Sequence, residues 1–184
     1  MVVRRSPARS VTADYILDEA RNLVMENGWD RFSLRALARA VSLSPASLYE
    51  YFDNKEAILE AVAERGRKRL VDQLREVPPD ASQRMVELAM AYVRFAREYR
   101  EDFLLLFARS AEPGAPAKTS PYAVWLNQAA RELRDNPHEV AYAVWACAHG
   151  LAMLQLTELN GVEADFATSD RAAIAGLVAS FRER

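Results

Sequence analysis

The chain has 184 residues, of which 51% are hydrophobic and 27% are charged. This composition is typical of a folded globular protein and excludes both an intrinsically disordered and a fibrous chain. The net charge of −2 excludes a protein that is basic throughout, but nucleic-acid binding requires only a local positive face.

Positive charge is concentrated toward the N-terminus. Residues 1–69 contain 12 Lys and Arg against 10 Asp and Glu, and the first ten residues, MVVRRSPARS, hold three arginines and no acid. A basic arm of this kind can hold a phosphate backbone, and it can equally be a solvated tail.

The single cysteine, Cys147, allows no intramolecular disulfide, which fits a reducing compartment. No apolar run reaches membrane-spanning length and no signal-peptide core is present, so we expect a cytoplasmic protein without membrane contact. With only two histidines, a metal site is not expected, and no sequence motif indicates a cofactor.

Helical periodicity and capping signals follow one another along the chain, without the alternation of a strand. The first helix is predicted from Thr12, as its N-cap, to Asn27, with Gly28 as a left-handed stop. Proline, glycine and serine predict a loop over residues 110–121. The later helices are predicted over residues 34–41, 45–52, 55–75, 82–98, 100–110, 121–134, 137–159 and 169–183. In the helix over residues 82–98, helical periodicity predicts an apolar stripe through Met85, Leu88, Ala89, Tyr92 and Phe95. These patterns predict an all-α fold of about nine helices.

Residues 33–52 have the pattern of a helix-turn-helix. Ser33 can cap the first helix, and the second helix can start at Pro45 with Ser44 as its cap. In such a unit the second helix enters the major groove of DNA, where small residues allow close approach. The alternative is a tight helical hairpin without a DNA-binding role.

Aromatic and basic residues follow this short helix. The hydroxyl groups of Tyr49 and Tyr51 can reach phosphate oxygens, and Lys55 adds a cation where the next helix begins. Leu48 and Phe52 are expected to face the core. The pattern therefore indicates a phosphate clamp at the end of a groove-reading helix, whereas in the alternative hairpin the rings belong to the core.

The run Leu48-Tyr49-Glu50-Tyr51-Phe52, followed by Lys55-Glu56, resembles the DNA-binding module of the TetR family of transcriptional regulators. The helix exit ENGWDRFSL is also similar. The resemblance implies that the chain contacts DNA through Ser33, Arg35, Ser44, Pro45, Ala46, Ser47, Tyr49, Tyr51 and Lys55.

Three departures from the family pattern stand out. Ser42 occupies a turn position where glycine is usual, so a left-handed backbone there has a cost. Ala46 and Ser47 replace the usual glycine and threonine. Glu50 places a carboxylate on the short helix, where it can accept from a cytosine amino group or point away from DNA. The operator sequence of a relative therefore does not transfer to this chain.

By the same resemblance, residues 1–54 form the arm and the DNA-binding domain, and residues 55–184 form a helical domain for effector binding and dimerisation. The run WACAHG resembles a Trp-x-x-x-His-Gly signature of one C-terminal subgroup, and His149 within it can face a ligand, a dimer axis or the core. Candidate effector contacts are Met90, Phe103, Phe107, Tyr122, Trp125, Trp145, His149 and Met153, although such residues are more often ordinary core.

The last two helices, about residues 138–159 and 169–183, are rich in small apolar residues. Close helix packing needs such residues, so we expect a homodimer through these helices, with an intramolecular core as the alternative. The expected function is a dimeric regulator, by resemblance a repressor, that leaves a palindromic operator when a small, largely apolar effector binds. A regulator controlled by a partner protein, and an activator, are the alternatives. The sequence shows no nucleophile–base or metal-binding constellation, so we do not expect an enzyme.

Overall fold

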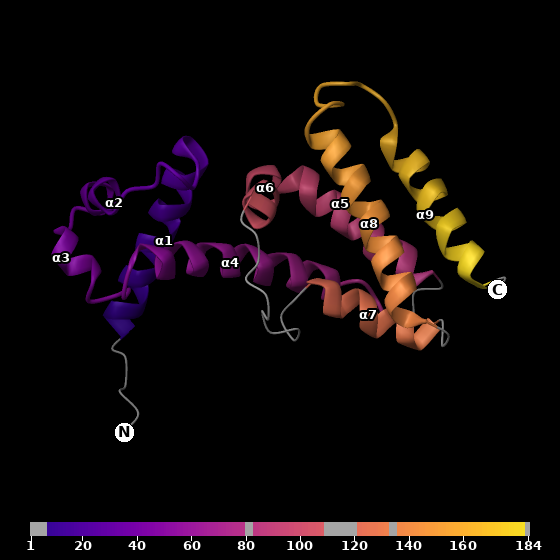
Figure 1. The fold of residues 1–184 in the computed structure, drawn as a ribbon, viewed down its shortest axis with the longest axis horizontal. Coiled ribbons are helices and arrows are strands. Elements are labelled where there is room, and N and C mark those ends of the chain that lie inside the picture. The colour runs from indigo at the N-terminus through magenta and orange to yellow at the C-terminus, as the bar shows by residue number, and fades with distance from the viewer. Residues whose placement is uncertain (1–6, 80–82, 109–120, 133–135, 183–184) are drawn as a thin grey trace. The chain divides into compact units, whose positions relative to one another are not determined.

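The computed structural model describes residues 7–79, 83–108, 121–132 and 136–182, and every regular element in these ranges is an α-helix (Figure 1). The predicted all-α class is confirmed. The helices are α1 (Pro7–Asn27), α2 (Leu34–Ala40), α3 (Pro45–Leu48), α4 (Lys55–Arg75), α5 (Arg84–Glu98), α6 (Arg100–Ala108), α7 (Pro121–Glu132), α8 (Pro137–Leu156) and α9 (Phe166–Arg182).

The chain divides into two compact units, Met1–Arg65 and Gly66–Arg184. Helix α4 contributes its first half to the N-terminal unit and its second half to the C-terminal unit. The boundary between functional domains that we drew before Lys55 coincides with the start of this helix, and it stays a prediction.

The core of the N-terminal unit is built on an apolar stripe of α1. Ile16, Ala20 and Val24 lie four residues apart, and each is at most 1% exposed. Gly28 ends α1 with φ of +80°, the left-handed conformation predicted for it. Arg65 of α4 donates to the Asp18 carboxylate over 3.0 Å and also pairs with Asp14, so α4 is tied to α1 within this unit.

Two of the predicted helix ends in this unit are wrong. Helix α1 begins at Pro7, because proline suits the first helical position and no breaker follows it before Thr12, which is therefore interior. Helix α3 ends at Leu48 instead of Phe52. Beyond it, the N–H groups of Tyr49 and Glu50 bond three residues back, so the chain tightens into 3₁₀-like turns.

The helix ends of the C-terminal unit also differ from prediction. Helix α8 ends at Leu156 and not at residue 159. Helix α9 begins earlier, at Phe166, because the Asp165 carboxylate accepts from the Thr168 N–H and hydroxyl. Two further helix ends, predicted at residues 110 and 134, lie outside the described residues. The same holds for nearly all of the predicted loop 110–121.

The C-terminal unit has one continuous apolar core. Helix α5 supplies its central stripe, in which Met85, Leu88, Ala89, Tyr92 and Phe95 are fully buried, as the sequence periodicity predicted. Helix α9 lies beside α8 in Figure 1 and packs on α5 as well. None of the described helices combines the length and apolar character that crossing a bilayer would require.

Candidate functional site

The turn between α2 and α3 is built by two serine caps and one unusual backbone conformation. The Ser33 hydroxyl accepts from the Ala36 N–H at 3.4 Å, and the Ser44 hydroxyl accepts from the Ser47 N–H at 3.0 Å, so both predicted caps are confirmed. Ser42 has φ of +56°, which is left-handed and unfavourable for a serine. The turn therefore keeps the backbone geometry for which glycine is better suited.

The nine residues predicted to contact DNA all lie at the surface of the N-terminal unit. Ser47, Tyr51 and Lys55 are half-buried and the others are exposed. Tyr49 is 56% exposed, whereas Leu48 beside it is 1% exposed and anchors α3 to the core. Phe52, which we expected in the core, is half-buried. The arrangement leaves α3 open to solvent along one side.

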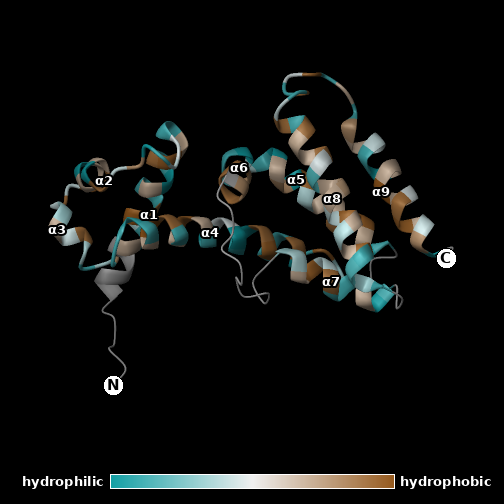
Figure 2. Ribbon diagram, viewed as in Figure 1, coloured by the Kyte–Doolittle hydropathy of each residue, from teal (hydrophilic) through white to brown (hydrophobic). Residues whose placement is uncertain are grey.

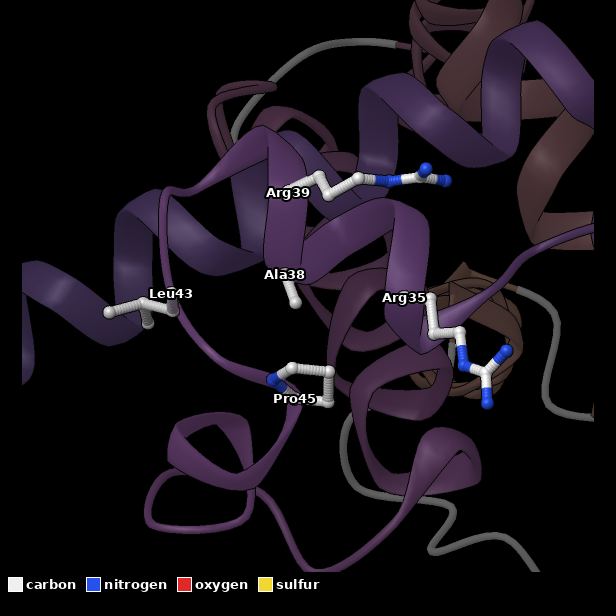
Figure 3. A pocket seen from close by; sticks show the side chains of 5 residues that line it. All are labelled: Arg35, Ala38, Arg39, Leu43 and Pro45. Atoms are coloured by element: carbon white, nitrogen blue, oxygen red, sulfur yellow. The ribbon is translucent and has the colours of Figure 1, made fainter.

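A hollow of about 430 Å³ lies where α2 meets the turn. Figure 3 shows Arg35 and Arg39 extending from α2, with Pro45 facing Ala38 between α3 and α2. The two arginines are four residues apart on one helix face, an arrangement that is mildly repulsive by itself. No ion pair to either is seen in the described residues. The hollow therefore has a cationic side that a phosphate group would complement.

Arg39 was not among the residues predicted from sequence. Its position four residues after Arg35 on a short helix is the signal that could have found it.

Lys55 lies at the start of α4, where the Asn54 side chain accepts from the Ala57 N–H at 2.7 Å. Its ammonium group lies 5.8 Å from the centroid of the Phe32 ring. This contact positions the lysine at the N-terminal edge of the helix. A cation at the N-terminus of a helix favours an anion such as phosphate.

In the C-terminal unit, several of the residues predicted for effector binding gather around Tyr92 of α5, which the sequence assigned only to the core. The Tyr92 ring stands edge-on to Phe103 at 5.3 Å and to Trp125 at 6.1 Å between centroids, and all three are fully buried. Phe107 is 38% exposed, and its ring lies 4.5 Å from that of His149. These residues form an aromatic cluster: Tyr92, Phe103, Phe107, Trp125 and His149.

Polar groups inside this cluster are sparse. The Tyr92 hydroxyl and His149 Nδ1 are 3.0 Å apart and share a hydrogen bond. Burial lowers the pKa of His149 and raises the pKa of Tyr92, so both side chains are neutral near pH 7. The indole N–H of Trp125 is buried without a hydrogen-bond partner in the described residues.

The remaining effector candidates lie around the same core. The Tyr122 ring is 5.6 Å from that of Trp145, and its hydroxyl lies 3.4 Å from His138 Nδ1. Met90 and Met153 are half-buried against the core, and no described contact draws them into the cluster. Cys147 is half-buried, and burial raises the pKa of its thiol, which lowers the thiolate fraction and so the reactivity of the cysteine.

The small residues of α8 and α9 divide between two environments. Ala141, Ala148 and Ala152 are fully buried and belong to the core of the unit. On α8, a second stripe is exposed: Tyr142, Ala146, Gly150 and Leu154. On α9, Ala172, Ala173, Gly176 and Ala179 are exposed as well. Figure 2 shows mainly hydrophobic colours along α8 after its first turn. The intramolecular core therefore accounts for only part of this composition.

Comparison with known proteins identifies both halves of the chain. Residues 16–62 match the family model described as bacterial regulatory proteins of the tetR family. Residues 85–177, half of the chain, match the model described as the tetracyclin repressor-like C-terminal domain. The chain belongs to the TetR family of transcriptional regulators. Proteins of this family are DNA-binding regulators and not enzymes, and ligand binding and homodimers are typical of them.

Similar proteins include two curated regulators and one solved structure. YobS of Bacillus subtilis, an uncharacterized HTH-type transcriptional regulator, is 34% identical over 95 residues, which are 50% of each chain. IcaR of Staphylococcus aureus, a negative regulator of a biofilm operon, is 43% identical over 47 residues, which are 26% of this chain and 25% of IcaR. A Rhodococcus protein of unknown function has a TM-score of 0.74 at 26% identity, covering 97% of both chains.

The chain thus spans half the length of YobS and a quarter of IcaR in these matches. The matched residues of this TetR-family regulator include α2, the turn and α3. Within the part of the chain that the structure describes, no group of histidine, cysteine or acidic side chains is arranged to hold a metal ion.

Proposed function

We propose that this TetR-family regulator is a dimeric repressor that binds a palindromic operator and leaves it when a small, largely apolar effector binds. The observation that carries the DNA-binding part is the exposed surface of α2 and α3, which joins small residues on α3 to two arginines on α2 that form no ion pair with any described residue. Two such surfaces in a dimer would read half-sites one helical turn apart, about 34–36 Å.

The contacts to DNA divide by chemistry. Pro45 and Ala46 present small apolar surfaces suited to thymine methyl groups, and Ser47 is the polar candidate for a base edge or a phosphate. The Ser47 hydroxyl lies 2.9 Å from that of Ser44, so the cap orients it.

The contacts that position the regulator on the duplex fall on phosphates. The predicted phosphate contacts come from Arg35, Tyr49, Tyr51 and Lys55, with Ser33 at the start of α2. Arg39, which lines the hollow, is proposed as a further phosphate contact. Phosphate contacts make affinity depend on salt but carry no sequence information directly. Sequence preference is therefore expected to come from α3.

The dimer contact is proposed on the exposed stripe of α8 and the exposed small residues of α9. Tyr142 is 66% exposed and Leu154 is 48% exposed, which is unusual for large apolar residues spaced along one helix face. A Cβ atom added at Gly150 or Gly176 would meet nothing within 4 Å in the single chain. A two-fold packing of these helices against a second copy would cover that surface.

The effector site is proposed around the aromatic cluster of the C-terminal unit. Its members come from α5, α6, α7 and α8, and Phe107 with His149 forms the side that solvent can reach. An effector bound there would lower operator affinity through its differential affinity for the DNA-competent and the released states. Repression is proposed because IcaR is a negative regulator, and the cytoplasm is proposed because the operator would be there.

The test of DNA binding is selection of bound fragments from the source genome with purified protein at two salt concentrations. We expect a short palindrome that is enriched less strongly at the higher salt. Tyr49→Ala and Lys55→Ala should each weaken binding by about 1–3 kcal/mol, whereas Tyr15→Ala is the matched control, because Tyr15 is 48% exposed on α1 outside the proposed surface. Absence of any enriched sequence would refute the proposed role of α3.

A further inference from the structure

The hydrogen bond between Tyr92 and His149 fixes which nitrogen of the imidazole carries the proton. Tyr92 is fully buried, and the described residues offer its hydroxyl proton no acceptor other than His149 Nδ1, at 3.0 Å. A buried hydroxyl left without an acceptor would be costly, so the phenol donates and Nδ1 accepts. The neutral imidazole then carries its own proton on Nε2.

This arrangement turns His149 into a fixed hydrogen-bond donor. Nε2 has no hydrogen-bond partner among the described residues. The imidazole contacts the rings of Phe103 at 5.6 Å and Phe107 at 4.5 Å, and these two rings also contact each other at 5.0 Å between centroids. His149 is half-buried and Phe107 is 38% exposed, so this is the side of the cluster that solvent reaches. The second unpaired donor in the cluster is the Trp125 indole.

The cluster therefore presents donors without acceptors in an apolar setting. None of the described contacts places a lysine or arginine on its five rings, so the described residues offer a bound carboxylate no counter-charge. A cationic ligand would bring further donors and no acceptor. A neutral molecule with an apolar body and one acceptor atom satisfies both requirements.

Resting on the proposed effector site, we infer that Tyr92 and His149 form its polar anchor. The effector is then a neutral, mainly apolar molecule whose carbonyl oxygen, or an equivalent acceptor, binds the N–H at His149 Nε2. The exposed ring of Phe107, 4.5 Å from the imidazole, contacts the apolar body. Tyr92 is a positioning residue, because it acts through the imidazole.

The test compares two probes of the same shape, 2-acetylnaphthalene and 2-isopropenylnaphthalene, which differ by C=O against C=CH₂. Dissociation constants are measured by calorimetry on the full chain, with 2-naphthoate as an anionic third probe. The ketone should bind about tenfold more tightly than the hydrocarbon, because only the ketone can accept from the N–H at His149 Nε2. The naphthoate should bind more weakly than the ketone.

Substitutions at Tyr92 and His149 test whether the preference for the ketone over the hydrocarbon depends on these two residues. His149→Leu should reduce the ratio of the two affinities to about one, and His149→Gln, which keeps a donor, should restore part of it. Tyr92→Phe should lower the ratio, because the proton is then no longer fixed on Nε2. His138→Leu is the matched control, since it removes the exposed histidine that also faces a tyrosine, and it should leave the ratio unchanged.

The ratio of the two dissociation constants distinguishes an anchor from a structural role, because a purely structural defect would weaken the binding of both probes equally. Equal binding of ketone and hydrocarbon to the natural protein would overturn the anchor and leave an apolar effector site standing. A preference that survives in His149→Leu would overturn it as well. If none of the probes binds, both the anchor and the proposed effector site are refuted. DNA binding is tested separately, by fragment selection.

Discussion

The two units of this regulator hold their candidate functional residues in opposite ways. In the N-terminal unit these residues stand on the surface, as Tyr49 does at 56% exposure, and buried neighbours such as Leu48 hold the backbone that presents them. In the C-terminal unit the candidates are themselves part of the core, and Phe103 and Trp125 are fully buried. Function and stability therefore rest on different residues in one unit and on the same residues in the other.

This difference decides how each unit can be tested. A surface residue such as Tyr49 can be replaced with little effect on folding, so a loss of binding reports contact with DNA. Replacing Trp125 or Phe103 opens a cavity, so a loss of effector binding also reports destabilisation. Experiments on the C-terminal unit therefore need a ratio, a matched substitution or a change of pH.

The largest effect is expected at the residue that anchors α3. Leu48→Ala should lower the free energy of unfolding of the N-terminal unit by about 2–5 kcal/mol, because it leaves a cavity beneath the turn. Leu43→Ala is the control, since Leu43 is half-buried at the edge of the hollow and should cost much less. Urea denaturation, followed by Trp29 fluorescence and by far-UV circular dichroism, measures both.

The two units should respond separately to that substitution. Trp29 lies in the N-terminal unit, whereas Trp125 and Trp145 lie in the C-terminal unit. In a Trp29→Phe background, fluorescence from the other two should report an unfolding transition that Leu48→Ala leaves in place. An equal shift of both transitions would show that the units unfold as one.

A smaller gain in stability is expected where the turn is strained. Ser42→Gly should raise the free energy of unfolding of the N-terminal unit by about 1 kcal/mol, because glycine adopts φ of +56° without a steric cost. Asn136→Gly is the matched control, since Asn136 has φ of +52° but asparagine tolerates this region better than serine. Chemical denaturation of both variants gives the comparison, and equal gains would argue against strain at Ser42.

The exposed faces of α8 and α9 predict effects of opposite sign on folding and association. Gly150→Ala should stabilise the single chain by about 0.5–1 kcal/mol, because alanine favours the helix and its Cβ meets open space. If a second copy packs there, the same methyl group should weaken the dimer. Analytical ultracentrifugation over a range of concentrations measures association, and thermal denaturation at low concentration measures the single chain.

Gly66→Ala supplies the control for that comparison. A Cβ at Gly66 would lie 3.0 Å from Leu106 Cδ2 inside the C-terminal unit. This substitution should therefore stabilise the chain less than Gly150→Ala does, without changing association. A dimer that tolerates Gly150→Ala unchanged would place the dimer contact elsewhere.

The sequence predicts best what local chemistry decides. The caps at Ser33 and Ser44 and the left-handed stop at Gly28 were predictable, because each depends on residues within one helical turn. The predicted start of α1 at Thr12 was wrong, because threonine is also tolerated inside a helix once an earlier residue, Pro7, can begin it. Helix ends are therefore less certain than helices.

Contacts between distant segments are what the sequence could not supply. Periodicity correctly placed Tyr92 in the core, but its hydroxyl bonds to His149, 57 residues later in the chain. No local pattern carries that pairing. Arg39 was missed for a different reason, because the TetR-like motif draws attention to α3 and not to the second turn of α2. The choice among core, ligand and dimer axis for His149 needed the fold, which places it half-buried against Tyr92 and Phe107.

The smallest expected effect is a pH dependence that belongs to the C-terminal unit. Burial lowers the pKa of His149 below its ordinary value of about 6.5, so between these two pKa values the unfolded chain binds more protons than the folded one. The free energy of unfolding should therefore fall as the pH is lowered through about 6.5, and this loss should level off below the folded pKa. Denaturation with urea at a series of pH values measures the slope.

A second group, the Glu87 carboxylate, titrates at lower pH. The Arg171 guanidinium holds the pKa of Glu87 below its ordinary value, so stability from this pair should be lost only as the pH falls below about 4.5. His149→Gln should abolish the upper step and leave the lower one, and Glu87→Gln should do the reverse. If the upper step survives His149→Gln, a different group titrates there, and the imidazole beside Tyr92 is not the neutral donor that the effector anchor requires.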